Sequence, residues 1–458
     1  MSESRLSLPA DSPVLPLARA IEAAGGRIVV VGGWVRDALR GVASHDFDLE
    51  VFGLGEAAVD TALAGFGFTP RVGRQFPVWR RVRDGLDLAF PRAAADTYQR
   101  ARPESLDAAF RGASRHRDLR VNAIGWDPLT ERLLDPWDGL LDLQEKRLRA
   151  VDPETFPADP VRLLRVARLQ AVLEAEVDDE LASLCRGIAL DAVPVERLAG
   201  ELRRMLLDVP RPSQAFGWLA EIGRLEVFPP LARLAGVPQD PVWHPEGDVL
   251  VHTLMVLDRA RAIAEELAGE AREVLLLAAL CHDLGKPETT TREGARVRSL
   301  AHEQASAARA GDWLAGLRFA ERVVHAVAVL VSHHLSPSQF VAQGAGAKAY
   351  RRLARKLAAA GLSLVDLERL ARADHLGRTT EAALAGRYEA GDKFLAAAAA
   401  AEVREAPRAD VVSAKALIER GVTPGPELGR RLRRCREIED ETGWREPERI
   451  LARCLAEP

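Results

Sequence analysis

The sequence predicts an α+β protein in which a first third that contains strands precedes two thirds that are helical. The strand signals are short β-branched or alternating runs broken by glycine and proline: RIVVVGG, FDLEVFG, PVWRRVR and GLDLAFP. After about residue 155 the pattern changes to long amphipathic stretches such as DPVRLLRVARLQAVL, VERLAGELRRMLL and EVLLLAALCHDLG. Prolines near residues 210, 229, 238 and 337 separate these helices.

The composition fits a soluble protein of two to four domains, since the 458 residues are 47% hydrophobic and 28% charged. The four cysteines lie far apart without a C-x-x-C pair, so neither a disulfide framework nor a cysteine zinc site is expected. An uninterrupted apolar window of about 18 residues and a signal peptide are both absent from the sequence. We therefore expect a cytoplasmic protein without a membrane segment.

Residues 30–53, VVGGWVRDALRGVASHDFDLEVFG, combine a short apolar strand with two glycines and a pair of aspartates. Side chains at i and i+2 of a strand share a face, so Asp46 and Asp48 present two carboxylates together. Magnesium prefers such oxygen ligands, and two ions about 4 Å apart activate a hydroxyl and neutralise a triphosphate. Gly32 and Gly33 let backbone N–H groups approach phosphate, and Arg36 follows about one helical turn later. This combination favours nucleotidyl transfer.

A third carboxylate is expected on a neighbouring strand, and Asp87 in GLDLAF is the candidate. The alternative for Asp87 is an exposed strand residue. A D-x-D pair by itself is weak evidence because surface turns often contain one. The preceding GG-x-V-R-D arrangement makes the metal interpretation of Asp46 and Asp48 much stronger.

The segment resembles the head of the class II tRNA nucleotidyltransferase and bacterial poly(A) polymerase family, within the polymerase beta superfamily. Four further segments resemble successive motifs of that family in the same order: GRQFPVW at 73–79, HRDLRVNAI at 116–124, LLDPWDGLLDLQEKRLRAV at 133–151 and FPADPVRLLRVARLQA at 156–171. The resemblance implies an N-terminal polymerase-beta-like nucleotidyltransferase head with a small mixed sheet, followed by an all-α neck. It implies Mg²⁺ in the head, and CTP, ATP and tRNA as partners.

By the same resemblance, Asp46 and Asp48 hold the metal, while Gly33, Arg36 and Arg117 meet the triphosphate. In DPVRLLRVAR, four charged residues recur three apart and would share or neighbour one helix face; they are Asp159, Arg162, Arg165 and Arg168. Asp159 and Arg162 would read the edges of the incoming base. The alternative is a capped amphipathic helix with an exposed basic stripe.

The sequence departs from the family pattern at two positions. Ala158 stands where the family usually has glutamate, and His116 replaces the first arginine of an R-R-D motif. These changes bear on base selection more than on metal binding. An enzyme that adds only CC or only A, or a poly(A) polymerase, therefore stays open as an alternative.

Eight of the ten histidines lie between residues 244 and 375, and LCHDLGK places His282 and Asp283 at the end of an apolar helix. A charge buried there is costly unless a metal or a partner compensates it. With HPEGDVLVHT, AHEQAS, VSHHLS and ARADHLGR, the region resembles the HD superfamily of metal-dependent phosphohydrolases. The implied ligands of the first metal are His252, His282, Asp283 and Asp374.

A second ion would be bound by His302 and by either His333 or His334, of which His333 is the residue we assign; Lys286 would contact phosphate. Imidazole and carboxylate together suit Ni, Mn, Fe or Zn, and the sequence does not choose among these metals. His325 and His375 are interpreted as core or surface residues.

An arginine-rich run, RRLRRCR at 430–436, places arginines at helical spacing near the C-terminal end. We expect Arg430, Arg431 and Arg434 to contact RNA phosphates, because GVTPGPELGRRLRR resembles the last, tRNA-gripping helical module of the family. The alternative is a solvated helix face paired with Glu437, Glu439 and Asp440.

Together these signals predict four domains: a nucleotidyltransferase head at 1–155, a helical nucleotide-recognition and RNA-binding neck at 156–235, an HD domain at 236–385 and a helical C-terminal module at 386–458. The expected function is template-independent addition or repair of the tRNA 3′ CCA end, with HD phosphatase or 2′,3′-cyclic phosphodiesterase activity. A further alternative is an RNA-binding protein whose main activity is HD phosphohydrolysis. The sequence leaves the oligomeric state open.

Overall fold

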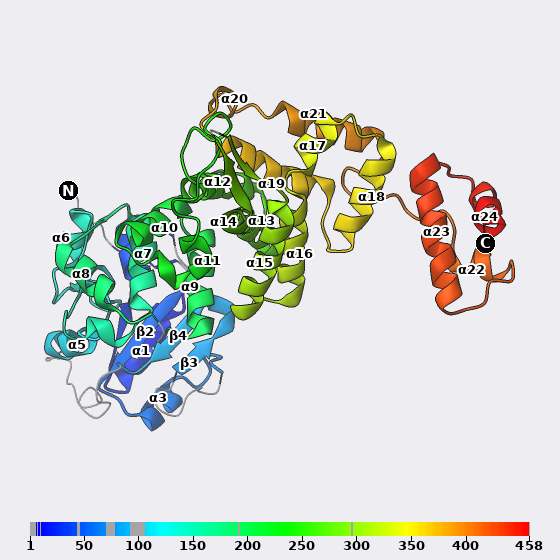
Figure 1. The fold of residues 1–458 in the computed structure, drawn as a ribbon. Helices are drawn as coiled ribbons and strands as arrows, with labels where there is room; N and C mark the ends of the chain where they lie inside the picture. The colour runs from blue at the N-terminus through cyan, green and yellow to red at the C-terminus, as the bar shows by residue number, and fades with distance from the viewer. Residues whose placement is uncertain are drawn as a thin grey trace. The chain divides into compact units, whose positions relative to one another are not determined.

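The computed structural model describes residues 6, 8–9, 11–43, 46–69, 78–91, 106–190, 193–294 and 296–457 (Figure 1). Residues 73–77 of the GRQFPVW motif lie outside this part of the chain. The chain forms two compact units, Met1–Val193 and Pro194–Pro458, whose boundary falls inside the expected neck at 156–235. Each unit is considered by itself below.

A six-stranded sheet, drawn in blue to cyan in Figure 1, forms the centre of the first unit. Its strand order is β3-β4-β2-β1-β5-β6, and β2 pairs with β4 in parallel whereas the other neighbours are antiparallel. The sheet is therefore mixed, and the four strands expected from the sequence are its β1 to β4. The bounds are β1(Arg27–Val31), β2(Phe47–Phe52), β3(Val78–Arg81), β4(Leu86–Ala89), β5(Gly125–Asp127) and β6(Arg132–Leu134).

Strand β1 is buried on both faces, and its alternating side chains serve two cores. Ile28 and Val30 pack into the larger core with α1(Val14–Ala23), α2(Gly33–Leu39) and α3(Glu56–Ala62). Val29 and Val31 face the smaller core with α5(Leu106–Ser114). An uninterrupted apolar run is thus required, which explains the RIVVV sequence.

The first unit continues with short elements and two longer helices. These are η1(Val82–Asp84), η3(Arg120–Asn122), α6(Gly139–Gln144), β7(Arg147–Leu148), η4(Phe156–Ala158), α7(Arg162–Leu173), β8(Glu176–Val177) and α8(Asp179–Gly187). Strand β8 pairs in parallel with β7. The expectation that everything after about residue 155 is helical is therefore wrong at β8, and again at the hairpin β9(Thr290–Glu293)–β10(Arg296–Ser299) in the second unit.

Helix α13(Gly269–Cys281) is the central element of the second unit, because all eight residues from Val274 to Cys281 are buried. It packs against α9(Val195–Leu207), α12(Val249–Ile263), α16(Glu321–His333) and α19(Leu364–Leu376). A helix that is apolar all round needs neighbours on every side. The second unit also contains α10(Pro212–Glu221), η5(Leu225–Val227), α11(Pro229–Ala232), η6(Ala264–Glu266), α14(Lys286–Thr289), α15(His302–Gly316), α17(Ser336–Ala342), α18(Ala347–Ala358), α20(Glu381–Leu384) and α21(Glu389–Ala400).

The C-terminal helices α22(Ala414–Ile418), α23(Pro426–Thr442) and α24(Pro447–Ala456) enclose a small core of their own. Cys435 and Cys454 lie in this core, and all four cysteines of the chain are buried free thiols. Within the described part of the chain, every helix is too short or too polar to cross a membrane.

Gly125→Ala should destabilise the first unit by about 1–3 kcal/mol, because overpacking a filled core forces its neighbours to move. A Cβ at Gly125 would lie 2.6 Å from Phe110 Cζ and 2.7 Å from Val29 Cγ1. Gly187→Ala is the matched control, since a Cβ at this helical position meets nothing within 4 Å. Urea unfolding of both variants measures the difference, and equal stabilities would contradict the packing described for β5.

Candidate functional site

Three carboxylates gather at one end of the sheet in the first unit; we call Asp46, Asp48 and Asp87 the carboxylate cluster. Asp48 alternates with the buried Phe47 and Leu49 of β2, so its side chain leaves the apolar core. The parallel pairing of β2 with β4 places Asp87 directly beside Asp48. Asp46 immediately precedes β2 and is exposed. The two strands therefore bring together the residues that the sequence analysis expected to meet.

Partial burial of the carboxylate, helped by repulsion within the carboxylate cluster, raises the pKa of Asp48. Desolvation of the carboxylate by the surrounding protein atoms is the largest cause of the raised pKa. The positive charge of Arg117 opposes this rise, and the negative charges of Asp87, Glu50 and Asp46 add to it. The residue as a whole remains exposed, so an ion can reach it from solvent. A divalent cation relieves repulsion of this kind, and carboxylate oxygens are the donors that magnesium prefers. The cluster thus fits a magnesium site.

The carboxylate of Asp87 is also bound within the protein. Arg80 on β3 donates two hydrogen bonds to it, at 2.8 and 2.7 Å. This ion pair is what the alternative interpretation of Asp87, an exposed strand residue without a metal, leads us to expect. Each oxygen of Asp87 keeps a second lone pair for a metal, but the positive charge of Arg80 competes with the ion for this carboxylate.

Gly32 and Arg117 lie next to Asp48. A Cβ on Gly32 would be 3.2 Å from Asp48 Oδ2 and 3.5 Å from Arg117 Nη1, and the residue has a φ of +77°, which favours glycine. Arg117 donates to Glu50 at 2.7 Å, which holds its guanidinium in place. The absence of a side chain at Gly32 thus leaves room between a carboxylate and a cation.

Arg36 lies beside Gly33 but is buried in an internal network. It donates to Asp37 at 2.9 and 2.8 Å and to Asn122 Oδ1 at 2.7 Å. Asn122 donates in turn to Asp118, whose other oxygen accepts from Arg165 at 2.5 Å. This chain of contacts connects three motifs that are far apart in the sequence.

The expectation that Asp159, Arg162, Arg165 and Arg168 share one helix face is wrong for Asp159. Helix α7 begins at Arg162, and Asp159 is extended with φ −121° and ψ 102°. Arg162 donates to the main-chain oxygen of His116 at 2.6 Å and to that of Thr155 at 3.0 Å. Because the contact at His116 uses its backbone, the departure from arginine at this position leaves the placement of Arg162 unaffected.

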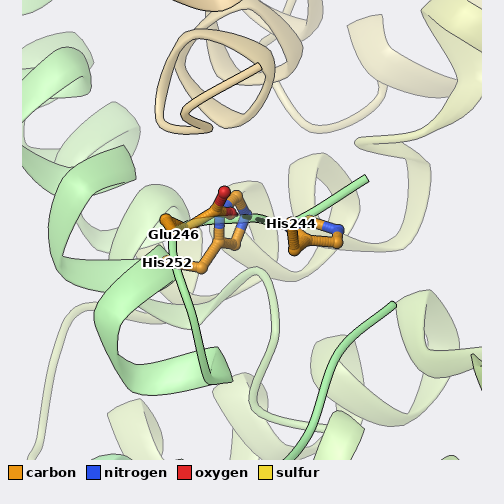
Figure 2. A group of neighbouring side chains, drawn as sticks. All are labelled: His244, Glu246 and His252. Carbon is orange, nitrogen blue, oxygen red and sulfur yellow. Dashed lines mark hydrogen bonds and ion pairs between the residues drawn. The ribbon is translucent and has the colours of Figure 1, made fainter. Parts of the chain in front are cut away.

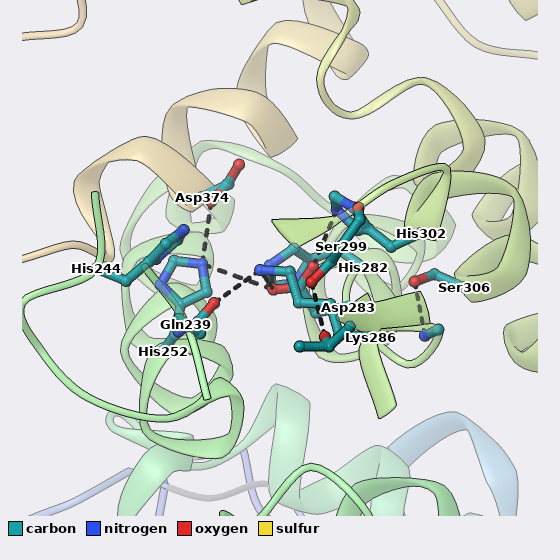
Figure 3. A network of polar contacts seen from close by, with 12 residues as sticks. Gln239, His244, His252, His282, Asp283, Lys286, Ser299, His302, Ser306 and Asp374 are labelled. Carbon is teal, nitrogen blue, oxygen red and sulfur yellow. Dashed lines mark hydrogen bonds and ion pairs between the residues drawn. The ribbon is translucent and has the colours of Figure 1, made fainter. Parts of the chain in front are cut away.

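A second group of side chains converges in the other unit from five separate elements (Figure 3). We call it the histidine cluster; its members are His252 (α12), His282 and Asp283 (end of α13), His302 (α15), His334 (end of α16) and Asp374 (α19). Asp283 is central, with Oδ2 3.1 Å from His282 Nε2 and Oδ1 3.3 Å from His302 Nε2. His252 Nε2 lies 3.1 Å from Asp374 Oδ1.

The imidazoles are oriented by hydrogen bonds on their outer nitrogens. The Nδ1 atoms of His282, His302 and His334 lie 2.8, 2.8 and 2.7 Å from main-chain oxygens three residues earlier in the chain. His252 uses Nδ1 to contact Glu246 Oε1 at 2.8 Å. Donation from Nδ1 leaves the Nε2 lone pair facing inward, which is the arrangement typical of metal-ligating histidine.

The donor set fits a transition metal on the evidence of its unpaired polar atoms. His282 Nε2 and both oxygens of Asp283 are buried and make no well-oriented hydrogen bond among the described residues, although His282, His302 and Lys286 surround the carboxylate at ion-pair distance. Burial alone would raise the pKa of Asp283, but His282, Lys286 and His302 outweigh it and hold the pKa well below its usual value. An ionised, buried carboxylate among inward-facing imidazole nitrogens suits Ni, Mn, Fe or Zn.

The assignment of His333 to the second ion is wrong, and His334 occupies that place. The ring of His334 lies 5.4 Å from that of His282 and 5.2 Å from that of His302. Burial, followed by His302 and His282, lowers the pKa of His334 to about 3, so it is neutral as a ligand must be. His333 instead lines a separate cavity of about 520 Å³ together with basic residues of α18.

Three further residues were missed from the sequence: His244, Glu246 and Arg378. Glu246 Oε1 lies within 2.9 Å of the Nδ1 atoms of both His244 and His252 (Figure 2). Arg378 pairs with Asp374 at 3.2 Å. The spacing Asp374–Arg378, four residues apart across the C-terminal end of α19, was a usable signal. His244 and Glu246 lie in a loop, where no periodicity indicates which side chains turn inward.

The C-terminal arginines are paired within their own module. Arg430 and Arg431 contact Glu427, and Arg434 contacts Glu437 and Glu457. Glu439 and Asp440 instead contact Arg355 of α18. These pairs favour the alternative of a paired helix face, although two of the expected acidic partners differ.

Family models match both units. The poly A polymerase head domain matches residues 28–149, and the HD domain matches residues 249–378. A multifunctional CCA protein of Halorhodospira halophila is 35% identical over 435 residues, which cover 89% of this chain and 95% of that protein. A multifunctional CCA protein of Paracidovorax citrulli is 39% identical over 306 residues, covering 64% and 69%.

Solved structures share the fold. A CCA-adding enzyme in complex with CTP is 17% identical with a TM-score of 0.63 and covers 98% of this chain and 96% of that one. The Thermotoga maritima CCA-adding enzyme complexed with tRNA is 16% identical with a TM-score of 0.58 and the same coverage. At these identities the likeness concerns the fold alone.

His334→Ala should lower the affinity of the purified protein for a transition metal by at least about tenfold, because it removes an inward-facing nitrogen donor. His333→Ala is the matched control, since the imidazole of His333 lies outside the histidine cluster. Metal content by mass spectrometry and competition with a chelator measure the difference. The reverse ranking of the two variants would restore the assignment of His333.

Asp118→Asn should destabilise the first unit by roughly 2 kcal/mol near neutral pH, because the folded state holds the charged carboxylate. Burial opposes ionisation of Asp118, but Arg165, Asn122 and the Leu119 amide lower its pKa from 3.8 to about 2. This stabilisation is complete above pH 3.8 and is lost as the pH falls through 2. Urea unfolding between pH 2 and 7 should therefore show the two proteins converging in acid. A difference that does not depend on pH would exclude the charge as its cause.

Proposed function

Because the chain belongs to the family of multifunctional CCA proteins, we propose that it builds or repairs the 3′ CCA end of tRNA from CTP and ATP without a template. The observation that carries the proposal is the carboxylate cluster beside Gly32 and Arg117. In this reaction the 3′-oxygen of the RNA bonds to the α-phosphorus of the nucleotide. The bond from that phosphorus to the bridging oxygen breaks, and pyrophosphate leaves with the electron pair.

Each candidate site residue of the head has a proposed role in this reaction. Asp46 and Asp48 hold magnesium, with Asp87 as the third carboxylate. Two bound Mg²⁺ ions would favour loss of the proton of the 3′-hydroxyl and offset charge on the triphosphate. Gly32 and Gly33 leave space for the phosphates, and Arg117 supplies positive charge beside them. Arg36 acts from the buried network behind Gly33 rather than from the open surface.

The base is read, in this proposal, by Asp159 and Arg162 at the start of α7, with Arg165 and Arg168 on the following turns. The Arg36–Asn122–Asp118–Arg165 network fixes α7 against the sheet that carries the carboxylate cluster. A fixed distance between the reading residues and the metal-holding residues is what a protein template requires. Ala158 is exposed just before Asp159 and bears on which bases are accepted, so addition of only CC or only A, and poly(A) synthesis, are alternatives.

For the second unit we propose metal-dependent phosphatase or 2′,3′-cyclic phosphodiesterase activity. His252, His282, Asp283 and Asp374 hold the first metal, and Asp283, His302 and His334 hold the second. The bound metals would supply Lewis acidity toward a phosphoryl oxygen. Lys286, whose Nζ lies 2.8 Å from Asp283 Oδ2, and Arg378 line a cavity of about 230 Å³ beside the cluster and orient the phosphate.

The C-terminal module remains the proposed contact for the tRNA outside its 3′ end. Arg430, Arg431 and Arg434 would exchange their present carboxylate partners for RNA phosphates. Arg430 is the most exposed of the three and the easiest to release, whereas Arg431 also donates to the main-chain oxygens of Cys454 and Glu457. A protein that binds RNA and acts mainly through the histidine cluster is the second candidate function, supported by the groups of buried side chains there that could hold a metal ion.

The two activities should be separable by substitution. With magnesium as the only metal, the protein should add C, C and A in order to tRNAs that end before C and after CC, and then stop. Asp48→Asn should lower incorporation at least about 100-fold, because it removes a metal-holding charge, and leave phosphate removal intact.

Asp283→Asn is the reciprocal control, and it should abolish removal of a 2′,3′-cyclic phosphate while incorporation continues. Gel analysis of labelled tRNA measures both reactions. Incorporation by Asp48→Asn at the unmodified rate would refute the magnesium assignment. Incorporation of adenosine alone into long tails would move the protein to the poly(A) polymerases.

A further inference from the structure

Trp243 lies exposed at the rim of the cavity beside the histidine cluster. Its side chain is 63% exposed, and it is the one aromatic residue among the large exposed hydrophobic side chains of the described chain. The same residue lines the cavity together with Lys286, His302 and Asp374. An indole that is left in water at the entrance to a polar cavity gains nothing for folding and is suited to a ligand.

The turn that carries Trp243 is fixed on both sides by residues of the site. Lys286 Nζ donates to Gln239 Oε1 at 2.7 Å (Figure 3). His244 Nδ1 lies 2.9 Å from Glu246 Oε1 (Figure 2). The main-chain oxygen of Asp240 accepts from the Trp243 amide at 3.1 Å and from the His244 amide at 2.8 Å. The indole is therefore presented from a hydrogen-bonded turn that Lys286 and Glu246 hold, and these two residues in turn contact Asp283 and His252.

The size and chemistry of the cavity restrict what it can enclose. Its volume is about 230 Å³, and its polar lining includes the cations Lys286 and Arg378. Pockets that enclose a whole drug-sized ligand usually start near 300 Å³. A phosphate with its sugar fits such a cavity, whereas an attached base has to remain outside, at the rim where Trp243 lies.

We infer that Trp243 is a platform on which the base of an unpaired nucleotide stacks while the phosphate of that nucleotide enters the cavity. The inference rests on the proposed phosphohydrolase function and adds its substrate class, a nucleoside phosphate whose base face is free. Stacking accepts any base because every base has a π face. A phosphate ester that lacks a base gains nothing from Trp243, and a terminal base that is paired cannot reach it.

The test compares two five-membered cyclic phosphodiesters with the full-length, metal-loaded protein: adenosine 2′,3′-cyclic monophosphate and glycerol 1,2-cyclic phosphate, which has no base. Trp243→Ala should raise KM for the adenosine compound about five- to 150-fold, the range of base–aromatic stacking, and leave kcat unchanged. It should leave both constants unchanged for the glycerol compound. Trp243→Phe should restore the KM, and Val242→Ala is the matched control, because this exposed neighbour lies outside the cavity lining.

A binding measurement separates failure of this inference from failure of the proposed function. AMP should quench tryptophan fluorescence of the unmodified protein but not of Trp243→Phe, while calorimetry gives similar affinities for the two proteins. If neither cyclic compound is hydrolysed but this pattern holds, the phosphohydrolase proposal fails and the base platform stands. The platform inference would be wrong if Trp243→Ala raised KM equally for both cyclic compounds. It would also be wrong if this variant bound AMP with unchanged affinity.

Competition with RNA distinguishes the two sources of the base. An oligonucleotide with an unpaired 3′-terminal nucleotide that displaces AMP more effectively than a paired one supports a terminal nucleotide of RNA on the platform. Displacement only by mononucleotides supports a free nucleotide. Equal displacement by paired and unpaired oligonucleotides would contradict stacking on Trp243.

Discussion

The buried carboxylate of Asp283 is the constraint on which the second unit depends. This residue is 1% exposed, and a charge in such a position costs several kcal/mol unless its surroundings compensate it. The compensation comes from neighbouring segments of the chain: His282 directly follows α13, Lys286 begins α14 and His302 begins α15. Moving any of these segments would leave the buried charge of Asp283 without a partner. The packing of the second unit and the stabilisation of Asp283 therefore depend on each other.

The first unit meets the opposite problem, since its carboxylate cluster is open to solvent and composed of like charges. Repulsion is tolerated there because water screens it and because Arg117 and Arg80 lie next to the cluster. The supporting network lies on the buried side, where Arg36, Asn122 and Asp118 satisfy one another. The buried network thus positions the surrounding elements, and the exposed carboxylate cluster keeps the negative charge that a bound cation requires.

The sequence was sufficient for those features that follow from periodicity. The strand pattern predicted Asp48 on β2 and Asp87 on a neighbouring strand, which pair directly, whereas Asp46 lies just before β2. It failed for Asp159, although a signal was available: Pro160 follows it, and the residue before a proline is disfavoured in a helix. It also failed between His333 and His334, because adjacent residues at a helix end differ by about 100° in direction and only packing selects the inward one. Glu246 and His244 had no signal, since their placement in a loop depends on contacts with His252.

The two clusters differ in a way that lets one chain keep two kinds of metal apart. The carboxylate cluster offers oxygen donors at an open surface, and magnesium, which gives up its water reluctantly, binds such sites while retaining much of its hydration. The histidine cluster offers imidazole nitrogens in a buried cavity, where a metal has to shed most of its water and where neutral His334 adds a donor without adding charge. Magnesium is a poor match for the second site, and a transition metal gains little from the first relative to its affinity for imidazole. Burial and donor type together therefore match the carboxylate cluster to magnesium and the histidine cluster to a transition metal, which is the division that the proposed function requires.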